Sequence, residues 1–431
     1  MMIIMRNLFV FLACLSTSVL AENKSAELPY IGTAPTALEP TSIKVTNKMD
    51  ARSCNFDDVS AVTSKAEPGT QVNIPAGTCD WGLNSLMVGP GVYIKGAGKN
   101  LTTIVLNPSV DTTSAAKRTP GNFLITFNCA PGKPNALSNL ALQGSGKGGE
   151  KLNGSDARDN GLHLNGWKYV NGVRLSSPCQ DFRVFNSKFS GFGFSAITVN
   201  GNPATTRGVI FNNDFINNFA FDTRYQSVIL GYGVTIYGDG GWPDLSLGTE
   251  ENIFIENNYM SGNRHHVASN NSSRYVFRYN TATSTGNTKN HFSIDVHGRG
   301  VNNGSKTGSR QYEIYGNFIN ADLPASDTIR NSIGIRGGDG VIFNNIFGAQ
   351  YRVGIELMVE GSYDGPGKPD CKTVPDSIRD LYIWENEMQM PEPAKNGVVS
   401  SCPEIVKLNR DYFLLAKKDY MPFAYPHPLR K

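Results

Sequence analysis

A short pattern recurs along the chain from Val184 onward: two apolar residues in alternation, then Asn, then another apolar residue two positions on. The copies are Ile210–Phe215, Phe254–Tyr259, Phe277–Asn280, Ile314–Ile319, Ile342–Phe347 and Ile383–Asn386, with an earlier copy at Val184–Phe189 that has Ser in place of the Asn. The spacing is irregular, from 23 residues (Phe254 to Phe277) to 44 residues (Ile210 to Phe254). A short unit repeated at irregular spacing predicts a repeat protein with loops inserted between some of its rungs.

A second pattern, apolar–any–apolar–any–Gly, lies between the copies of the first. It occurs at Leu162–Gly166, Ile197–Gly201, Val234–Gly238, Ile294–Gly298 and Ile333–Gly337, and without the Gly at Val267–Asn270 and Ile355–Met358. Two strand families that each recur once per rung are typical of a parallel β-solenoid, in which apolar residues point inward and stack. The Asn residues then align at a bend and predict an amide ladder. Unrelated strands of a β-sandwich are the alternative, and the regular alternation of the two patterns argues against it.

The composition fits a long β-rich chain. Its 431 residues exceed one ordinary compact core, which predicts two globular domains or one elongated solenoid. Gly is frequent, at 45 residues, and the charged fraction of 18% is below the usual quarter, which argues against a long helical bundle. The formal net charge of +3 argues against a strongly basic nucleic-acid-binding protein. Beyond the N-terminus, no segment has the roughly 20 consecutive apolar residues of a membrane span.

The N-terminus has the pattern of a secretory signal peptide. A positive charge precedes the apolar run Leu8–Leu15, and small residues predict cleavage after Ala21. A lipoprotein anchor at Cys14 is the alternative, but Phe11 stands where an aliphatic residue is required. We therefore expect a secreted or periplasmic protein. The predicted organisation is a signal peptide at 1–21, an extended leader or linker at 22–52 and a solenoid domain at 53–431.

The cysteine content agrees with export. Of the 7 cysteines, those that remain after removal of the signal peptide are even in number, as expected in an oxidising compartment. None has CxxC spacing, so we expect structural disulfides between neighbours in sequence rather than zinc binding or thiol chemistry. The candidates are Cys54, Cys79, Cys129, Cys179, Cys371 and Cys402. A short helix is predicted at 57–65, with Asn55 as its N-cap.

Three segments near the start of the predicted solenoid, Cys54–Val59, Gly69–Cys79 and Ile94–Gly98, resemble the N-terminal entry of pectin-lyase-like proteins. Tyr420–Leu429 is similar to the tail of many secreted members, so the resemblance covers most of the chain. It implies an all-β, single-domain, right-handed parallel β-helix with a short N-terminal capping helix and loop insertions, in a bacterial protein that acts on polysaccharide. The resemblance does not fix the reaction, because this fold hosts lyases, hydrolases, epimerases and non-catalytic adhesins.

Alignment of the second pattern predicts a polar patch on the outer face of one sheet. Its members are Tyr237, His266, Asn270, Asp295, His297 and Arg336. Rungs lie ~4.8 Å apart and alternate residues of a strand ~6.6 Å apart, so the patch has the size of one or two sugar rings. We predict that His297 is a catalytic base oriented by Asp295, and that Arg336 neutralises a substrate carboxylate. Tyr237 is predicted to donate a proton to the leaving oxygen.

A wider set of residues is predicted to bind the substrate. It comprises His266 and Asn270 in the patch, Glu356 further along the sheet, and Arg264, Lys289, Arg299 and Arg330 on the flanking loops. Small residues at Ala268 and Gly334 are expected to leave room for a ligand against the sheet. Phe292–His297 is also similar to the Tyr-Gly-Phe-Asp-Pro-His motif of mannuronan epimerases, but the similarity carries over to Asp295 and His297 only.

The chemistry of the patch predicts a polysaccharide lyase that cleaves a uronic-acid-containing polymer by β-elimination. The alternatives are a glycoside hydrolase with Asp295 and Glu356 as its two carboxyls, a uronate epimerase, and a non-catalytic carbohydrate-binding surface protein. Acidic residues are too sparse in the patch to predict Ca²⁺, and a metal site from His266, His291, Asp295 and His297 lacks a recognisable ligand spacing. We expect no cofactor, an acidic polysaccharide as partner, no nucleic acid, and a monomer.

Overall fold

The computed structural model describes residues 34, 36–106, 123–144, 151–152, 171–200, 206–222, 227–238, 247–299, 307–324, 326–360, 371, 377–389 and 397–431. The predicted signal peptide, the first part of the leader and the copy of the second pattern at Leu162–Gly166 lie outside these residues. Within the described ranges, no helix is long and apolar enough to cross a membrane.

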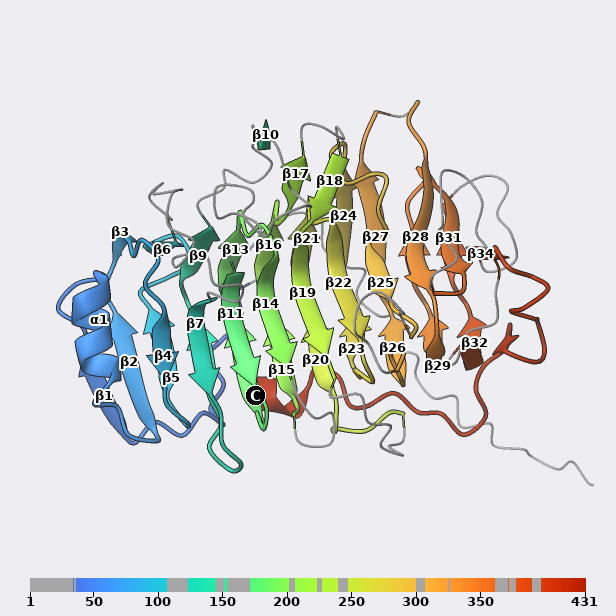
Figure 1. Cartoon of the computed structure of the whole chain (residues 1–431). Coiled ribbons are helices and arrows are strands. Elements are labelled where there is room, and N and C mark those ends of the chain that lie inside the picture. Colours follow the sequence, from blue (N-terminus) through green and yellow to red (C-terminus); the bar gives the residue numbers. More distant parts are fainter. Residues whose placement is uncertain are drawn as a thin grey trace, which may run out of the picture.

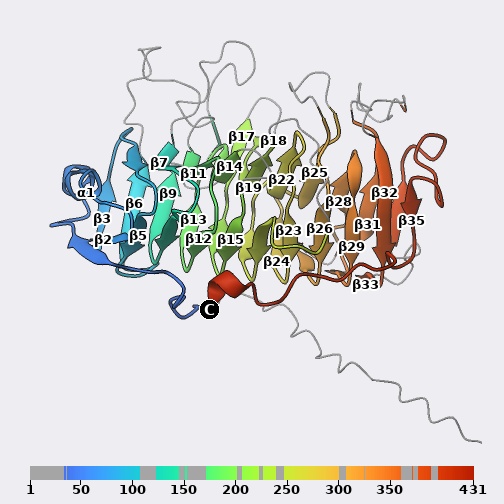
Figure 2. The ribbon, with the colours of Figure 1, turned by 90° about the horizontal axis from the view of Figure 1, so that it is seen from below.

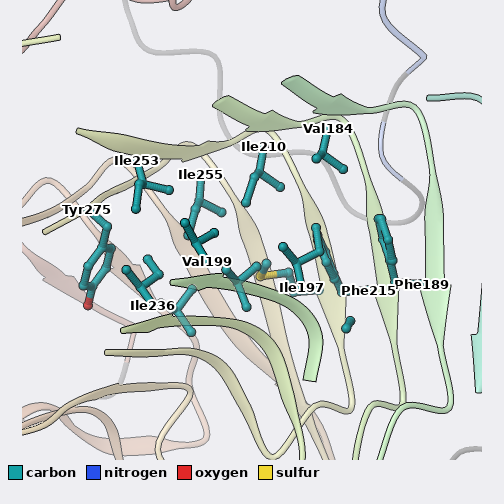
Figure 3. Packing of buried hydrophobic residues seen from close by; sticks show 14 of the residues in the cluster. Val184, Phe189, Ile197, Val199, Ile210, Phe215, Ile236, Ile253, Ile255 and Tyr275 are labelled. Atoms are coloured by element: carbon teal, nitrogen blue, oxygen red, sulfur yellow. The ribbon is translucent and has the colours of Figure 1, made fainter. Parts of the chain in front are cut away.

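The described strands form a right-handed parallel β-helix with three sheets, A, B and C, which confirms the predicted fold (Figure 1). In each turn the chain passes through one strand of sheet A, one of B and one of C, and neighbouring turns pair in parallel. Inward-facing apolar residues of all three sheets form one core. Figure 3 shows part of this core, in which Ile197 and Ile236 of sheet C face Val184 and Ile210 of sheet A.

The strands of the three sheets are as follows. Sheet A consists of β1 (Asn47–Asp50), β2 (Thr70–Ile74), β5 (Tyr93–Gly96), β8 (Ala136–Ser138), β12 (Phe182–Phe185), β15 (Gly208–Phe211), β20 (Ile253–Glu256), β23 (Val276–Arg278), β26 (Tyr312–Tyr315), β29 (Gly338–Phe343), β32 (Ile378–Trp384) and β35 (Tyr412–Phe413). Sheet B consists of β3 (Gly77–Asp80), β6 (Thr102–Leu106), β9 (Ala141–Gly144), β13 (Lys188–Ser190), β16 (Asp214–Ile216), β21 (Tyr259–Ser261), β24 (Thr281–Thr285), β27 (Phe318–Asp322), β30 (Ile346–Phe347) and β33 (Glu387–Met388). Sheet C consists of β4 (Leu86–Val88), β7 (Phe123–Asn128), β11 (Asn171–Ser176), β14 (Ser195–Asn200), β19 (Tyr232–Tyr237), β22 (His265–Asn270), β25 (Ile294–Val296), β28 (Ile329–Ile335), β31 (Tyr351–Leu357) and β34 (Val398–Ser400). A separate small sheet consists of β10 (Lys151–Leu152), β17 (Ala220–Asp222) and β18 (Ser227–Leu230).

The copies of the first pattern span the bend between sheets A and B. At this bend two consecutive residues have different structural roles. The first, such as Asn212 with a φ of 55°, takes the left-handed conformation that turns the chain, which Asn tolerates better than most residues. The second points inward and donates to the amide oxygen of the next rung, as Asn280 Nδ2 does to Asn317 Oδ1 at 3.1 Å. The predicted ladder is confirmed and runs through Asn213, Asn258, Asn280, Asn317, Asn345 and Asn386.

A short helix and a disulfide close the N-terminal end of the solenoid. The predicted helix is confirmed as α1 (Phe56–Thr63), and the Phe56 ring packs edge-on against Trp81 with the ring centroids 5.4 Å apart. β1, which lies in the segment assigned to the leader, pairs in parallel with β2 and so extends sheet A. Three disulfides join consecutive cysteines as predicted, namely Cys54–Cys79, Cys129–Cys179 and Cys371–Cys402.

A second apolar cluster lies on the outer face of sheet A and is covered by both ends of the described chain. Its aromatic side chains stack from rung to rung, as Phe343 and Trp384 do with their centroids 4.3 Å apart. Val45 of the leader and Phe423 of the C-terminal tail pack against it. Figure 2 shows the tail running back along the solenoid to η4 (Pro428–Arg430), and it meets the leader where the Ser42 N–H donates to the Lys431 carbonyl at 3.1 Å.

Replacing Asn280 by Ala is expected to destabilise the solenoid. The substitution leaves the Asn258 N–H, which donates to Asn280 Oδ1 at 2.9 Å, without a partner, and it also removes the Asn280 donors. An orphaned buried group costs about 1–3 kcal/mol, so we expect a loss of about 3 kcal/mol in the free energy of unfolding, measured by denaturant titration. The matched change Asn100→Ala, at an exposed turn, should alter it by less than about 0.5 kcal/mol. Equal effects of the two changes would contradict a structural role for the ladder.

Candidate functional site

The carboxylate of Asp295 lies at the centre of a polar cluster on the outer face of sheet C. Asp295 is in β25 and its side chain is only 2% exposed. Arg336, which follows β28 on the next rung, donates from Nη2 to both carboxylate oxygens and from Nε to Oδ1 at 3.1 Å. His297 Nε2 lies 3.0 Å from Asp295 Oδ2. The structure therefore brings together three of the four residues predicted to be catalytic.

A second carboxylate, that of Glu360, completes the cluster. Arg336 Nη1 donates to Glu360 Oε1 at 3.1 Å, and the Gly298 N–H donates to Glu360 Oε2 at 3.0 Å. His297 Nδ1 lies 3.4 Å from the same Oε2, so the imidazole is held between two carboxylates. The sequence reasoning missed Glu360 because it lies beyond the end of β31. The sequence did hold a signal for Glu360. It lies two residues after Met358 and four after Glu356, so continued alternation would place all three side chains on the same face of the sheet.

The pKa of each titratable group in this cluster depends on the charged groups beside it. Burial raises the pKa of Asp295, but Arg336 and the imidazoles of His297 and His265 outweigh that effect and hold the pKa well below its usual value. Burial also raises the pKa of Glu360, and His297 and Arg336 bring it below the usual value. Burial and Arg336 lower the pKa of His297, but the two carboxylates raise it further, so the net pKa is above its usual value. Two anions thus face two cations when the imidazole is protonated.

His265 takes the place in the cluster that was predicted for His266. The His265 Nε2 atom lies 3.4 Å from Asp295 Oδ2, and its Nδ1 atom is 2.6 Å from the Phe292 carbonyl. His266 is fully buried and bonds through Nδ1 to the Asn263 amide at 2.9 Å, and burial lowers its pKa to about 3. The assumed alternation fails here because the N–H groups of both His266 and Val267 point to the Ser293 carbonyl. The structure thus does not bring His266 into the patch.

Tyr232, at the start of β19, links the cluster to a further cation. Its ring stacks on His265 with the centroids 5.6 Å apart. Arg264 lies over the Tyr232 ring, 5.8 Å from its centroid, and donates from Nη1 to the Tyr232 hydroxyl at 3.2 Å. In the part of the chain that the structure describes, no carboxylate forms an ion pair with Arg264. Arg264 is half-buried, and its Nε atom is buried without a hydrogen-bond partner.

His291 connects the site to the small sheet. Its ring lies edge-on to His265, with the centroids 5.9 Å apart, and it bonds to the backbone of Val228 in β18. Burial, with a smaller contribution from the Arg264 charge, lowers the pKa of His291 to about 4, so the ring is neutral. Strands β17 and β18 therefore stand beside the Arg264 end of the site.

The other residues predicted for the site lie at its margins or away from it. Tyr237, at the end of β19, has its pKa raised by burial, and no described hydrogen bond joins it to Asp295 or His297. Lys289 pairs with Asp327 at 2.9 Å, and Arg299 is exposed. Asn270 is half-exposed at the end of β22, in register with Tyr237. The Arg330 side chain lies outside the described residues.

The face of sheet C beside Asp295 is less open than the small residues suggested. A Cβ added at Gly334 would lie 2.7 Å from the Phe292 ring, so that ring fills the space expected for a ligand. Glu356, in register with Gly334, is buried and accepts a hydrogen bond from the Ser401 hydroxyl. The open part of the cluster is at His297 and Arg336, whose side chains are 22% and 19% exposed.

Comparisons with known proteins return similar solved structures, whereas no family model and no curated protein matches the chain. An alginate lyase of polysaccharide lyase family 6, solved with a trisaccharide, is 15% identical with a TM-score of 0.43, over 82% of this chain and 74% of the other. A pectin methylesterase from Erwinia chrysanthemi is 9% identical with a TM-score of 0.40, over 83% and 92%. The catalytic unit of a thermostable α-1,3-glucanase from Streptomyces thermodiastaticus is 13% identical with a TM-score of 0.46, over 91% and 69%. The parallel β-helix is established by the pairing of this chain's own strands.

The imidazole of His297 is expected to titrate above the ordinary value of about 6.5, whereas the other described histidines titrate below it. NMR of the protein with labelled histidine measures this directly. Glu360→Gln removes one carboxylate and should lower the pKa of His297. Because the folded-state pKa is raised, the stability that this contact contributes is present below about pH 6.5 and lost as the pH rises through the folded-state pKa. A His297 pKa that is unchanged in the Gln variant would contradict the contact with Glu360.

Proposed function

We propose that this protein is a secreted carbohydrate-active enzyme that cleaves a uronic-acid-containing polysaccharide by β-elimination. The observation that carries the proposal is the presence, on one face of sheet C, of an imidazole held between two carboxylates and of the guanidinium of Arg264, which has no described carboxylate partner. Elimination beside a uronate needs both groups, because a cation makes the α-proton acidic and a base then removes it. The three disulfides fit an oxidising compartment such as the periplasm or the medium.

Arg264, rather than Arg336, is the residue that we assign to the substrate carboxylate. Arg336 already contacts Asp295 and Glu360, so its charge is balanced within the protein. Arg264 has the Tyr232 hydroxyl as its polar contact among the described residues. A planar guanidinium beside an aromatic ring suits a sugar acid, since the guanidinium binds the carboxylate in two-point fashion and the ring packs against the pyranose.

His297 acts as the base in its neutral form. The shorter contact, from Nε2 to Asp295, retains the Nε2 proton and leaves the lone pair on Nδ1, where Glu360 is 3.4 Å away. The Nδ1 atom is buried beside Glu360, so the substrate displaces the Glu360 contact to reach this lone pair. His297 takes the α-proton of the uronate. The electron pair of the broken C–H bond then forms the C=C bond, and the glycosidic C–O bond breaks. The Tyr232 hydroxyl, whose oxygen accepts from Arg264, donates a proton to the leaving oxygen.

The cluster supports a glycoside hydrolase less well. Both hydrolytic mechanisms need one carboxyl group that keeps its proton near neutral pH. The pKa values of Asp295 and Glu360 are both held below their usual values, so both groups are ionised. Glu356, the other carboxyl considered from the sequence, is buried against Ser401.

The mature protein is expected to produce an unsaturated uronate, seen as new ultraviolet absorbance, when mixed with a panel of uronic-acid polymers. His297→Ala should reduce the rate by about 10²–10⁴-fold, the usual contribution of a general base. Arg264→Ala should also lower the rate on these uronate polymers. Arg410→Ala, which removes an exposed arginine near the C-terminus, should leave the rate unchanged. Reducing ends released without absorbance would indicate a hydrolase instead. Binding without any product would indicate a non-catalytic protein.

The rate is expected to rise with pH. Because the pKa of His297 is raised, the neutral imidazole that acts as the base appears only above the ordinary value of about 6.5. The kcat/KM should therefore increase through an apparent pKa above this value and then level off, and Glu360→Gln should shift the midpoint to lower pH. A rate that falls over the same range would show that His297 acts as an acid and would overturn its assignment.

A further inference from the structure

The outer face of sheet C is closed in its middle on both sides of Asp295. Ala268, in register with Asp295 on the preceding rung, is only 7% exposed. Gly334, in register on the following rung, lies under the Phe292 ring. A long ligand that contacts His297 and runs along the solenoid axis therefore follows, among the described residues, the edge of the sheet on which His297 lies.

That edge carries a row of residues, one at the end of each strand or directly after it. The row consists of Asn200, Tyr237, Asn270, His297, Arg336 and Met358. Backbone pairing sets its last members, since each N–H donates to a carbonyl of the preceding rung, as Met358 does to Ile335 at 2.8 Å. From Asn200 to Arg336 the side chains are polar and partly exposed. Successive rungs lie ~4.8 Å apart, so this part of the row is a polar track along which a sugar chain can lie.

The row closes on the C-terminal side of Arg336. Met358, the next member, is fully buried. Glu360 folds back over Gly298, where an added Cβ would lie 2.9 Å from the Glu360 Cβ, and its carboxylate accepts from the Gly298 N–H at 3.0 Å. The described residues thus leave the row open toward the N-terminal rungs and closed directly beyond Arg336.

We propose that the enzyme acts at one end of its polysaccharide, with the terminal residue at His297 and the rest of the chain lying over Asn270 and Tyr237. The inference rests on the proposed β-elimination and adds its mode of action. A chain that continued past the terminal residue would meet Glu360 in a position that the protein fills. Phe292 and Glu360 are then specificity-determining residues, because they bound the space that the chain end occupies.

The proposed acid and base set the direction of the chain. Tyr232 lies in β19, and His297 follows β25, two rungs further toward the closed end. In β-elimination the sugar that loses its α-proton lies on the reducing-end side of the broken bond, and the leaving oxygen stays with the sugar on the other side. The reducing end of the polymer therefore faces the closed end of the row. Each cleavage releases a short unsaturated product from that end.

The test uses a polymer that gives ultraviolet absorbance with the mature protein, and an oligosaccharide of the same sugar that carries heavy oxygen at its reducing end. Early products should be about one or two sugars long, because only the His297 and Arg336 rungs, ~4.8 Å apart, lie at the closed end. They should carry the label, and the viscosity of the polymer should change little. Early products of many lengths with a fast fall in viscosity, or label on the long fragment, would overturn the proposal and leave the elimination itself intact. Absence of product from every polymer would overturn the elimination and the proposal together.

Two pairs of variants test the two ends of the track. Phe292→Ala removes the ring that covers Gly334 and should lengthen the early products, whereas Phe292→Leu keeps the cover and should retain the short ones. Tyr237→Ala should raise the KM for a long oligosaccharide about fivefold, with kcat and the KM for a disaccharide unchanged, because only the distant sugars lose a ring contact. Tyr237→Phe keeps the ring and should restore the KM for the long oligosaccharide. A KM that rises equally for short and long substrates in Tyr237→Ala would contradict the track.

Discussion

The buried amide at the bend between sheets A and B is the interaction on which the rest of the solenoid depends. Each amide of the ladder donates to the next rung, as Asn317 Nδ2 does to Asn345 Oδ1 at 2.9 Å, and its own oxygen accepts from the rung before. A slip by one residue would leave these groups unpaired and would turn every side chain of the strand to the other face. The columns of sheet C, and so the meeting of Asp295 with Arg336, follow from this fixed register.

Charge balance explains what the cluster on sheet C is able to do. Asp295 is almost wholly buried, and a carboxylate in that position is stable only with cations in direct contact. Arg336 and protonated His297 supply them, and Glu360 balances the second positive charge. Because the charge of Arg336 is already neutralised by Asp295 and Glu360, this residue is poorly suited to bind a substrate carboxylate. We therefore assign the proposed recognition of a substrate carboxylate to Arg264, a cation outside the balanced set.

Periodicity in the sequence was sufficient to predict the fold and the grouping of Asp295, His297 and Arg336, and the prediction failed where the strands are irregular. Asp295, His297 and Arg336 lie in regular strands or directly after them, so counting by two placed them on one face. His266 lies where two N–H groups share one carbonyl, and that irregularity turns it inward. Glu360 lies beyond its strand, where no pattern marks it. Arg336 forms ion pairs with two carboxylates of the protein. The spacing of residues in the sequence does not predict these contacts, because they depend on distances in the folded structure.

The two outer faces of the solenoid show why the same pair of residue types is a structural element in one place and a candidate site in another. On sheet A, Arg278 donates from Nε to Glu256 at 2.7 Å, and both side chains are fully buried. The tail covers this pair, with the Phe423 carbonyl accepting from Arg278 and Arg430 donating to Glu256. On sheet C, no described segment covers the cluster in this way, and about a fifth of the His297 side chain is exposed. Access to solvent, rather than the residue types, distinguishes the candidate site from the structural pair.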